Sequence, residues 1–259
     1  MDEDHILETR SLTKEFKGFI AVKDVNLQVR RGSIHALIGP NGAGKTTVFN
    51  LLTKFLIPSS GQILFNGNDI TKVKPADIAR QGLVRSFQIS AVFPHLTCLE
   101  NVRVALQKRL RGDSFDFWRS ETSLRSLDGE ADRLLESVNL AAYRDTAAVE
   151  LPYGRKRALE IATTLALEPE LMLLDEPMAG MGHEDIDRTA ELIRKVSANR
   201  TILMVEHNLS VVSDLSDKIT VLRRGEILAE GPYSTVSKDP QVMEAYMGSA
   251  DAALQGAHG

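Results

Sequence analysis

The stretch that most constrains this chain reads Gly39-Pro40-Asn41-Gly42-Ala43-Gly44-Lys45-Thr46-Thr47, and we call it the phosphate loop. It matches the pattern of a glycine, four further residues and Gly-Lys-Thr that binds the phosphates of nucleotides. An apolar run at 34–38 precedes the loop, and a helix-compatible stretch at 47–52 follows it. Because the motif requires this setting of strand, loop and helix, we predict that the chain binds a nucleoside triphosphate.

The phosphate loop also predicts which groups hold the nucleotide. Glycines allow consecutive backbone N–H groups to turn toward an anion, and the positive end of the following helix points to the same place. Lys45 is expected to reach the outer phosphates, and the Thr46 hydroxyl is expected to bind Mg²⁺.

The composition is that of an ordinary globular protein. The formal net charge of −4 argues against a dedicated nucleic-acid binder. The single cysteine, Cys98, excludes a disulfide within the chain, and we expect it to be a small packing residue. No apolar stretch approaches the ~20 residues of a membrane-spanning helix, and the acidic start at 1–5 lacks the features of a signal peptide. We therefore expect that the chain does not enter a membrane by itself.

Two kinds of strand pattern predict an α/β fold. Alternating apolar and polar residues at 25–30, and a short strand at 63–65 followed by Asn66-Gly67, indicate an antiparallel β-section. Nearly continuous apolar runs at 171–174 and 201–205 are typical of parallel strands that are buried on both faces. Helical spacing between these runs fits a crossover connection.

The strand signal fades between Gln88 and Thr164, where helical spacing replaces it at 100–110, 130–138 and 155–167. We predict a single domain over 1–249 with a P-loop NTPase core and a mainly parallel sheet. Its parts are the core with an antiparallel β-subdomain at 1–87 and 165–249, an inserted α-helical subdomain at 88–164, and a flexible tail at 250–259.

Four further side chains suit nucleotide hydrolysis. The run at 171–174 ends in Asp175 and Glu176, of which the first could complete the Mg²⁺ shell and the second could polarise an attacking water. His207 follows the run at 201–205, and loops at the carboxyl ends of parallel strands border nucleotide sites. Gln88 stands where strand character gives way to helix, and it could sense Mg²⁺ or phosphate. Taken alone, a histidine in this place is more often structural, and the glutamine is an ordinary surface residue.

Taken together, these residues resemble the ATP-binding subunits of ABC transporters, and the resemblance covers nearly the whole chain. The motifs stand in the family's order: Walker A at Gly39–Thr47, the glutamine loop at Gln88, the signature at Leu151-Pro152-Tyr153-Gly154-Arg155, Walker B at Asp175-Glu176, the D-loop at 179–182 and the switch histidine at His207.

The resemblance implies a role for each of these residues. ATP and Mg²⁺ are the implied cofactors, with Phe16 stacking on adenine and Thr46, Gln88 and Asp175 near the metal. Glu176 is the implied general base, His207 the phosphate sensor and Gln88 the link to a transmembrane partner. Such subunits work as head-to-tail pairs in which each ATP lies between the Walker A of one chain and the signature of the other. The implied signature contacts of this chain are Tyr153, Gly154 and Arg155.

Several segments are similar to the larger ATPase subunit of the high-affinity branched-chain amino acid uptake group. They are the Tyr153-Gly154 signature and the stretches at 110–127, 157–162, 179–181, 205–208 and 239–248. This likeness implies uptake of branched-chain or related hydrophobic amino acids at the cytoplasmic face of the inner membrane. The implied partners are a second ABC ATPase, two transmembrane permeases and, indirectly, a periplasmic solute-binding protein, with no nucleic acid.

Three residues depart from the family pattern. Pro152 replaces the usual serine, Arg155 the usual glutamine, and Gly182 the usual aspartate of the D-loop. Since proline has neither a hydroxyl nor an N–H, we predict an asymmetric heterodimer in which the site built on this signature hydrolyses ATP weakly.

Other functions stay open from the sequence. Close relatives of the group serve urea or amides, and the same kind of subunit also powers lipid export as a homodimer. A non-transport ABC ATPase acting on ribosomes or DNA would usually carry twin cassettes or long coiled coils, and this chain shows no sustained heptads. A P-loop kinase would not account for Gln88, Tyr153-Gly154 and His207 together.

Overall fold

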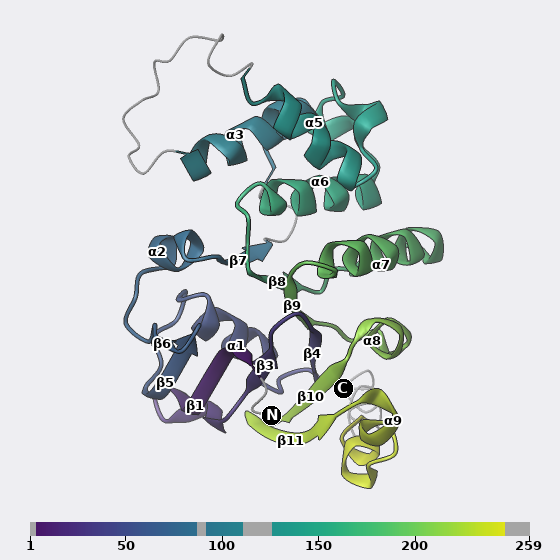
Figure 1. Cartoon of the computed structure of the whole chain (residues 1–259). Helices are drawn as coiled ribbons and strands as arrows, with labels where there is room; N and C mark the ends of the chain where they lie inside the picture. Colours follow the sequence, from purple (N-terminus) through teal and green to yellow (C-terminus); the bar gives the residue numbers. More distant parts are fainter. Residues whose placement is uncertain (1–3, 87–91, 111–125, 247–259) are drawn as a thin grey trace. The chain divides into compact units, whose positions relative to one another are not determined.

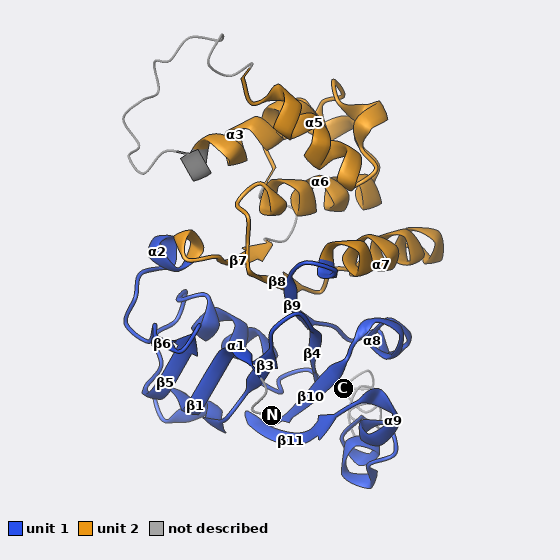
Figure 2. Ribbon diagram, in the orientation of Figure 1, with its two compact units in different colours: residues 1–78, 197–259 blue, residues 79–196 orange. Residues whose placement is uncertain are grey.

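The structure is a computed structural model that describes residues 4–86, 92–110 and 126–246. The chain divides into two compact units, residues 1–78 with 197–259 and residues 79–196 (Figure 2). Each unit has its own sheet strands and helices, most of which are labelled in Figure 1. Among the described residues, no helix has the length and apolar character needed to cross a membrane.

The first unit contains an antiparallel sheet in which one long strand pairs with three others. The members of this sheet are β1 (His5–Phe16), β2 (Phe19–Val25), β3 (Gln28–Arg30), β5 (Ser60–Phe65) and β6 (Asn68–Asp69). β5 and β6 form the expected hairpin, because Asn66 and Gly67 both take positive φ, which is what a tight hairpin turn requires.

The expected continuous strand at 25–30 is interrupted, although its alternation of buried and exposed residues holds. Side chains supply the backbone bonds at the interruption. Asn26 Oδ1 accepts the Ser11 amide at 2.8 Å, and Thr9 Oγ1 accepts the Leu27 amide at 2.8 Å. The Thr9 amide also donates to the Leu27 carbonyl oxygen at 2.8 Å, so side-chain acceptors break the regular ladder only in part, and the strand ends at Val25 and resumes at Gln28.

The second sheet of this unit is parallel apart from its edge. β4 (Ile34–Ile38) lies between β9 (Thr201–Val205) and β10 (Lys218–Arg223), both parallel to it, and β11 (Glu226–Gly231) is antiparallel to β10. Every residue of β4 and β9 is buried, as expected for parallel strands covered on both faces. The helices that begin in this unit are α1 (Lys45–Leu52), α2 (Pro75–Arg80), α8 (Leu209–Leu215) and α9 (Tyr233–Val236).

The second unit combines a strand pair with a group of helices. β7 (Leu83–Ser86) and β8 (Leu171–Asp175) are parallel neighbours. The helices are α3 (Cys98–Leu110), α5 (Asp128–Ser137), α6 (Tyr153–Leu165) and α7 (His183–Ser197), with 3-10 turns at Ala141–Tyr143 and Ala148–Glu150. α3 packs against α5 and α6 around the fully buried side chains of Val102, Leu106, Leu135 and Leu159. Cys98 is buried, which confirms its expected packing role, and burial raises its pKa to about 11.

Candidate functional site

The phosphate loop connects β4 to α1 in the first unit. α1 begins at Lys45, directly after Gly44, whose φ of 101° is open to glycine but strained for other residues. The first-turn amides of a helix have no acceptor within the helix, so those of α1 are directed toward the loop. The sequence of the loop therefore favours the binding of an anion at the start of α1.

Close packing fixes the shape of the loop at its two flanking glycines. A Cβ atom on Gly39 would lie 2.2 Å from the carbonyl oxygen of Leu222 in β10, and a Cβ atom on Gly44 would lie 2.7 Å from the carbonyl oxygen of Ala21 in β2. Both neighbours are backbone atoms that cannot turn aside. Only glycine therefore allows the chain to pass this close to both sheets.

Lys45 is folded over the loop that precedes it. Its Nζ donates to the carbonyl oxygens of Gly39 at 2.6 Å and Pro40 at 3.1 Å, and the side chain is half-buried. The ammonium group is therefore held beside the loop, where phosphate oxygens could replace these carbonyl acceptors. Thr46 is exposed on the same turn.

His207 lies at the same sheet edge as the phosphate loop. β9 is the parallel neighbour of β4, with Leu37 opposite Val205, so the carboxyl ends of the two strands lie side by side. His207 is exposed, whereas Glu206 beside it is completely buried. Glu206 Oε2 accepts the amides of His207 at 3.0 Å and of Asn208 at 3.2 Å. This carboxylate shapes the turn that presents His207.

Sequence reasoning missed the part that Glu206 plays. The only sequence signal is an acid directly after an apolar run, which must find hydrogen-bond partners if it is buried. Asn208 then begins α8, since its side-chain oxygen accepts the amides of Ser210 at 3.1 Å and Val211 at 3.4 Å.

Phe16 is the last residue of β1, opposite Phe19 on β2. Its side chain is 41% exposed, and the Lys14 Nζ lies 5.0 Å from the ring centroid. The ring is therefore partly exposed and lies next to a cation.

The second unit holds the predicted acids at the end of β8. Asp175 is buried, and its carboxylate forms an ion pair with Arg85 of β7. Arg157 of α6 donates from Nη2 to the Asp175 carbonyl oxygen at 3.2 Å. Glu176 follows with a φ of 45°, an uncommon conformation for a residue other than glycine. Such backbone strain is concentrated at functional sites in proteins.

A second buried pair supports Arg157. Arg157 Nη1 donates to Glu160 Oε2 at 2.5 Å, and both side chains are almost completely buried. Burial raises the pKa of Glu160, while the charge of Arg157 and its hydrogen bond act in the opposite direction. Neither Arg157 nor Glu160 was assigned a role from the sequence.

The signature residues begin α6. Pro152 occupies the N-cap position with no side-chain hydrogen bond, and the Tyr153 hydroxyl donates to the Ala179 carbonyl oxygen at 3.0 Å. A Cβ atom on Gly154 would lie 2.7 Å from the Asp185 carboxyl carbon, so α6 and α7 approach closely there. The Arg155 guanidinium lies 4.2 Å from the Tyr143 ring centroid and donates to the Asn139 carbonyl oxygen at 3.4 Å.

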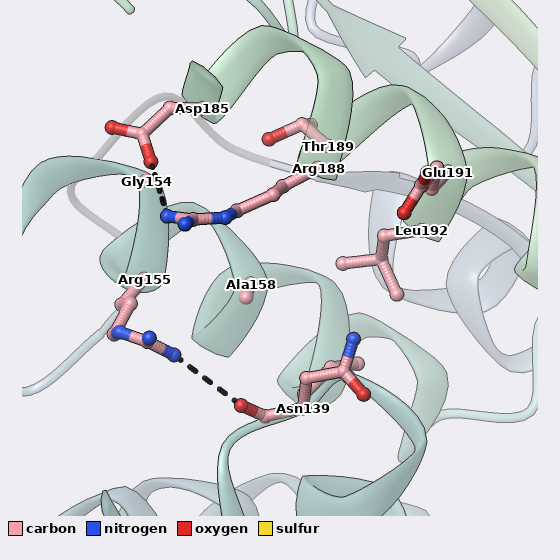
Figure 3. Close-up of a pocket in the computed structure, with 10 residues that line it drawn as sticks. Asn139, Gly154, Arg155, Ala158, Asp185, Arg188, Thr189, Glu191 and Leu192 are labelled. Atoms are coloured by element: carbon pink, nitrogen blue, oxygen red, sulfur yellow. Dashed lines mark hydrogen bonds and ion pairs between the residues drawn. The ribbon is translucent and has the colours of Figure 1, made fainter.

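A pocket of about 250 Å³ opens beside Gly154 and Arg155 (Figure 3). Arg188 of α7 reaches over it toward Asp185, with 3.7 Å between Nη1 and Oδ1, and Leu192 and Ala158 supply apolar walls. The pocket therefore combines both signs of charge with an apolar surface.

The predicted site residues divide between the two units. The phosphate loop, Phe16 and His207 belong to the first, and Asp175, Glu176 and the signature residues Tyr153–Arg155 belong to the second. Gln88 lies outside the described residues, as does the predicted tail at 250–259.

The described residues contain no group of three His, Cys, Asp or Glu side chains that could hold a metal ion. Mg²⁺ that arrives on a nucleotide usually takes one or two protein oxygens and completes its shell with phosphates and water. The Thr46 hydroxyl and the Asp175 carboxylate are oxygen donors of this kind.

Two family models match different parts of this chain, and both describe ABC transporters. The family model described as "ABC transporter" matches residues 22–179, which is more than half of the chain. A second family model, "Branched-chain amino acid ATP-binding cassette transporter", matches residues 226–252.

Relatives match along almost their whole length. The high-affinity branched-chain amino acid transport ATP-binding protein BraF of Pseudomonas aeruginosa is 39% identical over 95% of this chain and 98% of its own. The protein LivG of Escherichia coli, which carries the same description, has the same identity and coverage.

A solved structure of an ATP-binding cassette of an ABC transporter, in its ADP conformation, matches with a TM-score of 0.83. It is 31% identical over 94% of this chain and 99% of the solved one. The predicted α/β fold class is thereby confirmed. The matching family, the full-length relatives and the shared fold agree that this chain belongs to the ABC transporter family, as an ATP-binding cassette with ATPase activity.

Proposed function

We propose that this chain is the ATPase subunit of an importer that takes up branched-chain or related hydrophobic amino acids through membrane permeases. The match of residues 226–252 to the branched-chain family is the observation that carries the choice of solute, because the ATPase core alone is common to many transporters. The relatives named for branched-chain amino acid transport support the same choice.

The nucleotide is proposed to contact the following residues. The phosphate loop binds the phosphates through its amides and Lys45, and Phe16 stacks on adenine. Thr46 and Asp175 hold Mg²⁺, with Gln88 also near the metal, and Mg²⁺ when bound neutralises charge on the phosphates. The tight packing of Gly39 and Gly44, where a Cβ atom would lie 2.2 Å and 2.7 Å from backbone oxygens, supports this assignment of the loop.

Glu176 is proposed as the general base. It accepts a proton from the attacking water as the water oxygen bonds to the terminal phosphorus, while the bond from that phosphorus to the bridging oxygen breaks and ADP leaves. The strained backbone of Glu176 supports the assignment. His207, presented by the turn that Glu206 shapes, hydrogen-bonds the terminal phosphate, and Gln88 links the site to the permeases.

The proposed working unit is a heterodimer of this chain with a second ABC ATPase. Each ATP lies between one chain's phosphate loop and the other chain's signature. Pro152 offers no side-chain hydrogen bond at the start of α6, so the site built on this signature, including Tyr153, Gly154 and Arg155, hydrolyses ATP more weakly. The permeases complete the importer, which works indirectly with a periplasmic solute-binding protein, and this chain lies at the cytoplasmic face of the inner membrane.

Affinity purification of the chain from its native membranes, followed by mass spectrometry, tests this function. We expect a second, smaller ABC ATPase and two permeases, and faster ATP hydrolysis in reconstituted vesicles when the solute-binding protein carries leucine, isoleucine or valine. Stimulation by urea or amides instead would overturn the solute. Recovery of the chain only with copies of itself and a lipid-export permease, or with ribosomes, would overturn the importer.

A further inference from the structure

The carboxylate of Asp175 already has a cationic partner. Arg85 of β7 forms an ion pair with it, and the two side chains are only 14% and 8% exposed. Because β7 and β8 are parallel neighbours with Arg85 opposite Leu173, the sheet itself brings the guanidinium to the end of β8. Salt therefore screens this pair much less than it screens an exposed one.

The position of Asp175 does not depend on Arg85 alone. Its backbone carbonyl accepts from Arg157 at 3.2 Å, and Arg157 is anchored in turn by Glu160 at 2.5 Å. The end of β8 is therefore held by its backbone through α6, while Arg85 acts on the carboxylate. Removing the Arg85 charge is expected to free the carboxylate and leave its place in the fold unchanged.

From this geometry we propose that Arg85 is a positioning residue that competes with Mg²⁺ for the carboxylate of Asp175. In the nucleotide-free protein, Arg85 serves as the counter-ion that a buried carboxylate requires. When Mg²⁺ arrives with the nucleotide, the guanidinium and the dication repel one another, so the carboxylate gives up one as it accepts the other. Arg85 thus sets how much Mg²⁺ the site needs. This inference rests on the proposed role of Asp175 at the metal.

The test measures the Mg²⁺ dependence of nucleotide binding in the full chain. A fluorescent, non-hydrolysable ATP analogue is titrated in EDTA and at increasing Mg²⁺ for the wild type, Arg85→Gln and Arg85→Lys. We expect Arg85→Gln to lower the Mg²⁺ concentration at half-maximal effect by about tenfold or more, because one unit charge next to the dication is gone. Arg85→Lys keeps the charge but lacks the planar fork of arginine, so it is expected to lower this Mg²⁺ concentration only slightly.

A matched control is available in the same unit. Arg103 of α3 pairs with Asp128 of α5, with side chains 19% and 28% exposed, and it belongs to neither β7 nor β8. Arg103→Gln therefore removes an ion pair of similar kind and is expected to leave the Mg²⁺ requirement unchanged.

Thermal unfolding gives a second readout that does not depend on activity. With the analogue in EDTA, Arg85→Gln is expected to have a lower melting temperature than the wild type. Added Mg²⁺ is expected to raise the melting temperature of Arg85→Gln more than that of the wild type. If Arg85→Gln folds only with Mg²⁺ and the analogue, that also supports the competition. If it folds in neither condition, the Arg85→Lys variant is measured instead. The competition predicts that its Mg²⁺ requirement is slightly lower than that of the wild type, since lysine lacks the planar fork of arginine.

An unchanged or increased Mg²⁺ requirement in Arg85→Gln would overturn the competition between Arg85 and the metal. The failure of the proposed site looks different, because the wild type itself would then bind the analogue equally well with and without Mg²⁺, or would not bind it.

Discussion

Replacement of Gly39 by alanine is a direct test of the packing that shapes the phosphate loop. The new Cβ would lie 2.2 Å from the Leu222 carbonyl oxygen and 3.1 Å from the Ala43 Cβ. Contacts below 3.0 Å are essentially never seen for a Cβ, so either the loop or the end of β10 must move. In addition, the φ of 150° at Gly39 is one that L-residues rarely adopt.

Two costs add up at this position. Holding an L-residue in a sparsely populated backbone region costs about 1–3 kcal/mol, and forcing an extra methyl group into a packed site costs about 1–3 kcal/mol. We expect Gly39→Ala to lower the free energy of unfolding by about 2–6 kcal/mol, a large part of the ~5–15 kcal/mol of a typical domain.

Gly42→Ala is the matched control, because Gly42 also has a positive φ, 77°, but a Cβ atom there would meet nothing within 4 Å. Gly42→Ala is expected to lower the free energy of unfolding only by the cost of its backbone conformation, about 1–2 kcal/mol. Urea unfolding followed by circular dichroism measures both variants, and a fluorescent ATP analogue measures the nucleotide affinity of the folded fraction. Equal losses of stability in the two variants would refute the argument from close packing.

The remaining predictions concern catalysis, pH and pairing. Glu176→Gln is expected to keep ATP binding and to lower turnover at least ~10²-fold in a phosphate-release assay, and near-normal hydrolysis would remove Glu176 as the base. Burial lowers the pKa of His35 to about 4. Since the unfolded chain takes up this proton near pH 6.5, stability falls as the pH drops from 6.5 toward 4, by about 2 kcal/mol at pH 5. Urea midpoints at pH 7 and 5 should show this loss in the wild type and a smaller one in His35→Gln. Pro152→Ser is expected to strengthen the weaker site of the heterodimer, so an unchanged number of hydrolysing sites per dimer would contradict the proposed asymmetry.

The sequence alone predicted the strongly periodic elements and the loop between them. The nearly continuous apolar run at 201–205 became a buried strand, and Asn66-Gly67 became the turn of a hairpin. The prediction of a continuous strand at 25–30 was wrong. The interruption depends on the side chains of Thr9 and Asn26, which accept backbone amides 15 to 18 positions away. Propensity and alternation contain no information about such partners.

The same division holds for the candidate site. The sequence determined the nucleotide-binding motif and the nature of the proposed catalytic groups, because the glycines, Lys45 and the acids after a buried strand carry that chemistry locally. Only the tertiary structure decided that Gly39 passes against Leu222, that Glu206 shapes the turn before His207, and that Arg85 and Arg157 meet at Asp175. Some of these contacts join residues that are far apart in the sequence and meet only across strands and helices. Others depend on whether a charged side chain is buried. The physical reason is that a local pattern fixes the direction of the backbone, whereas packing fixes the partner of each buried polar group.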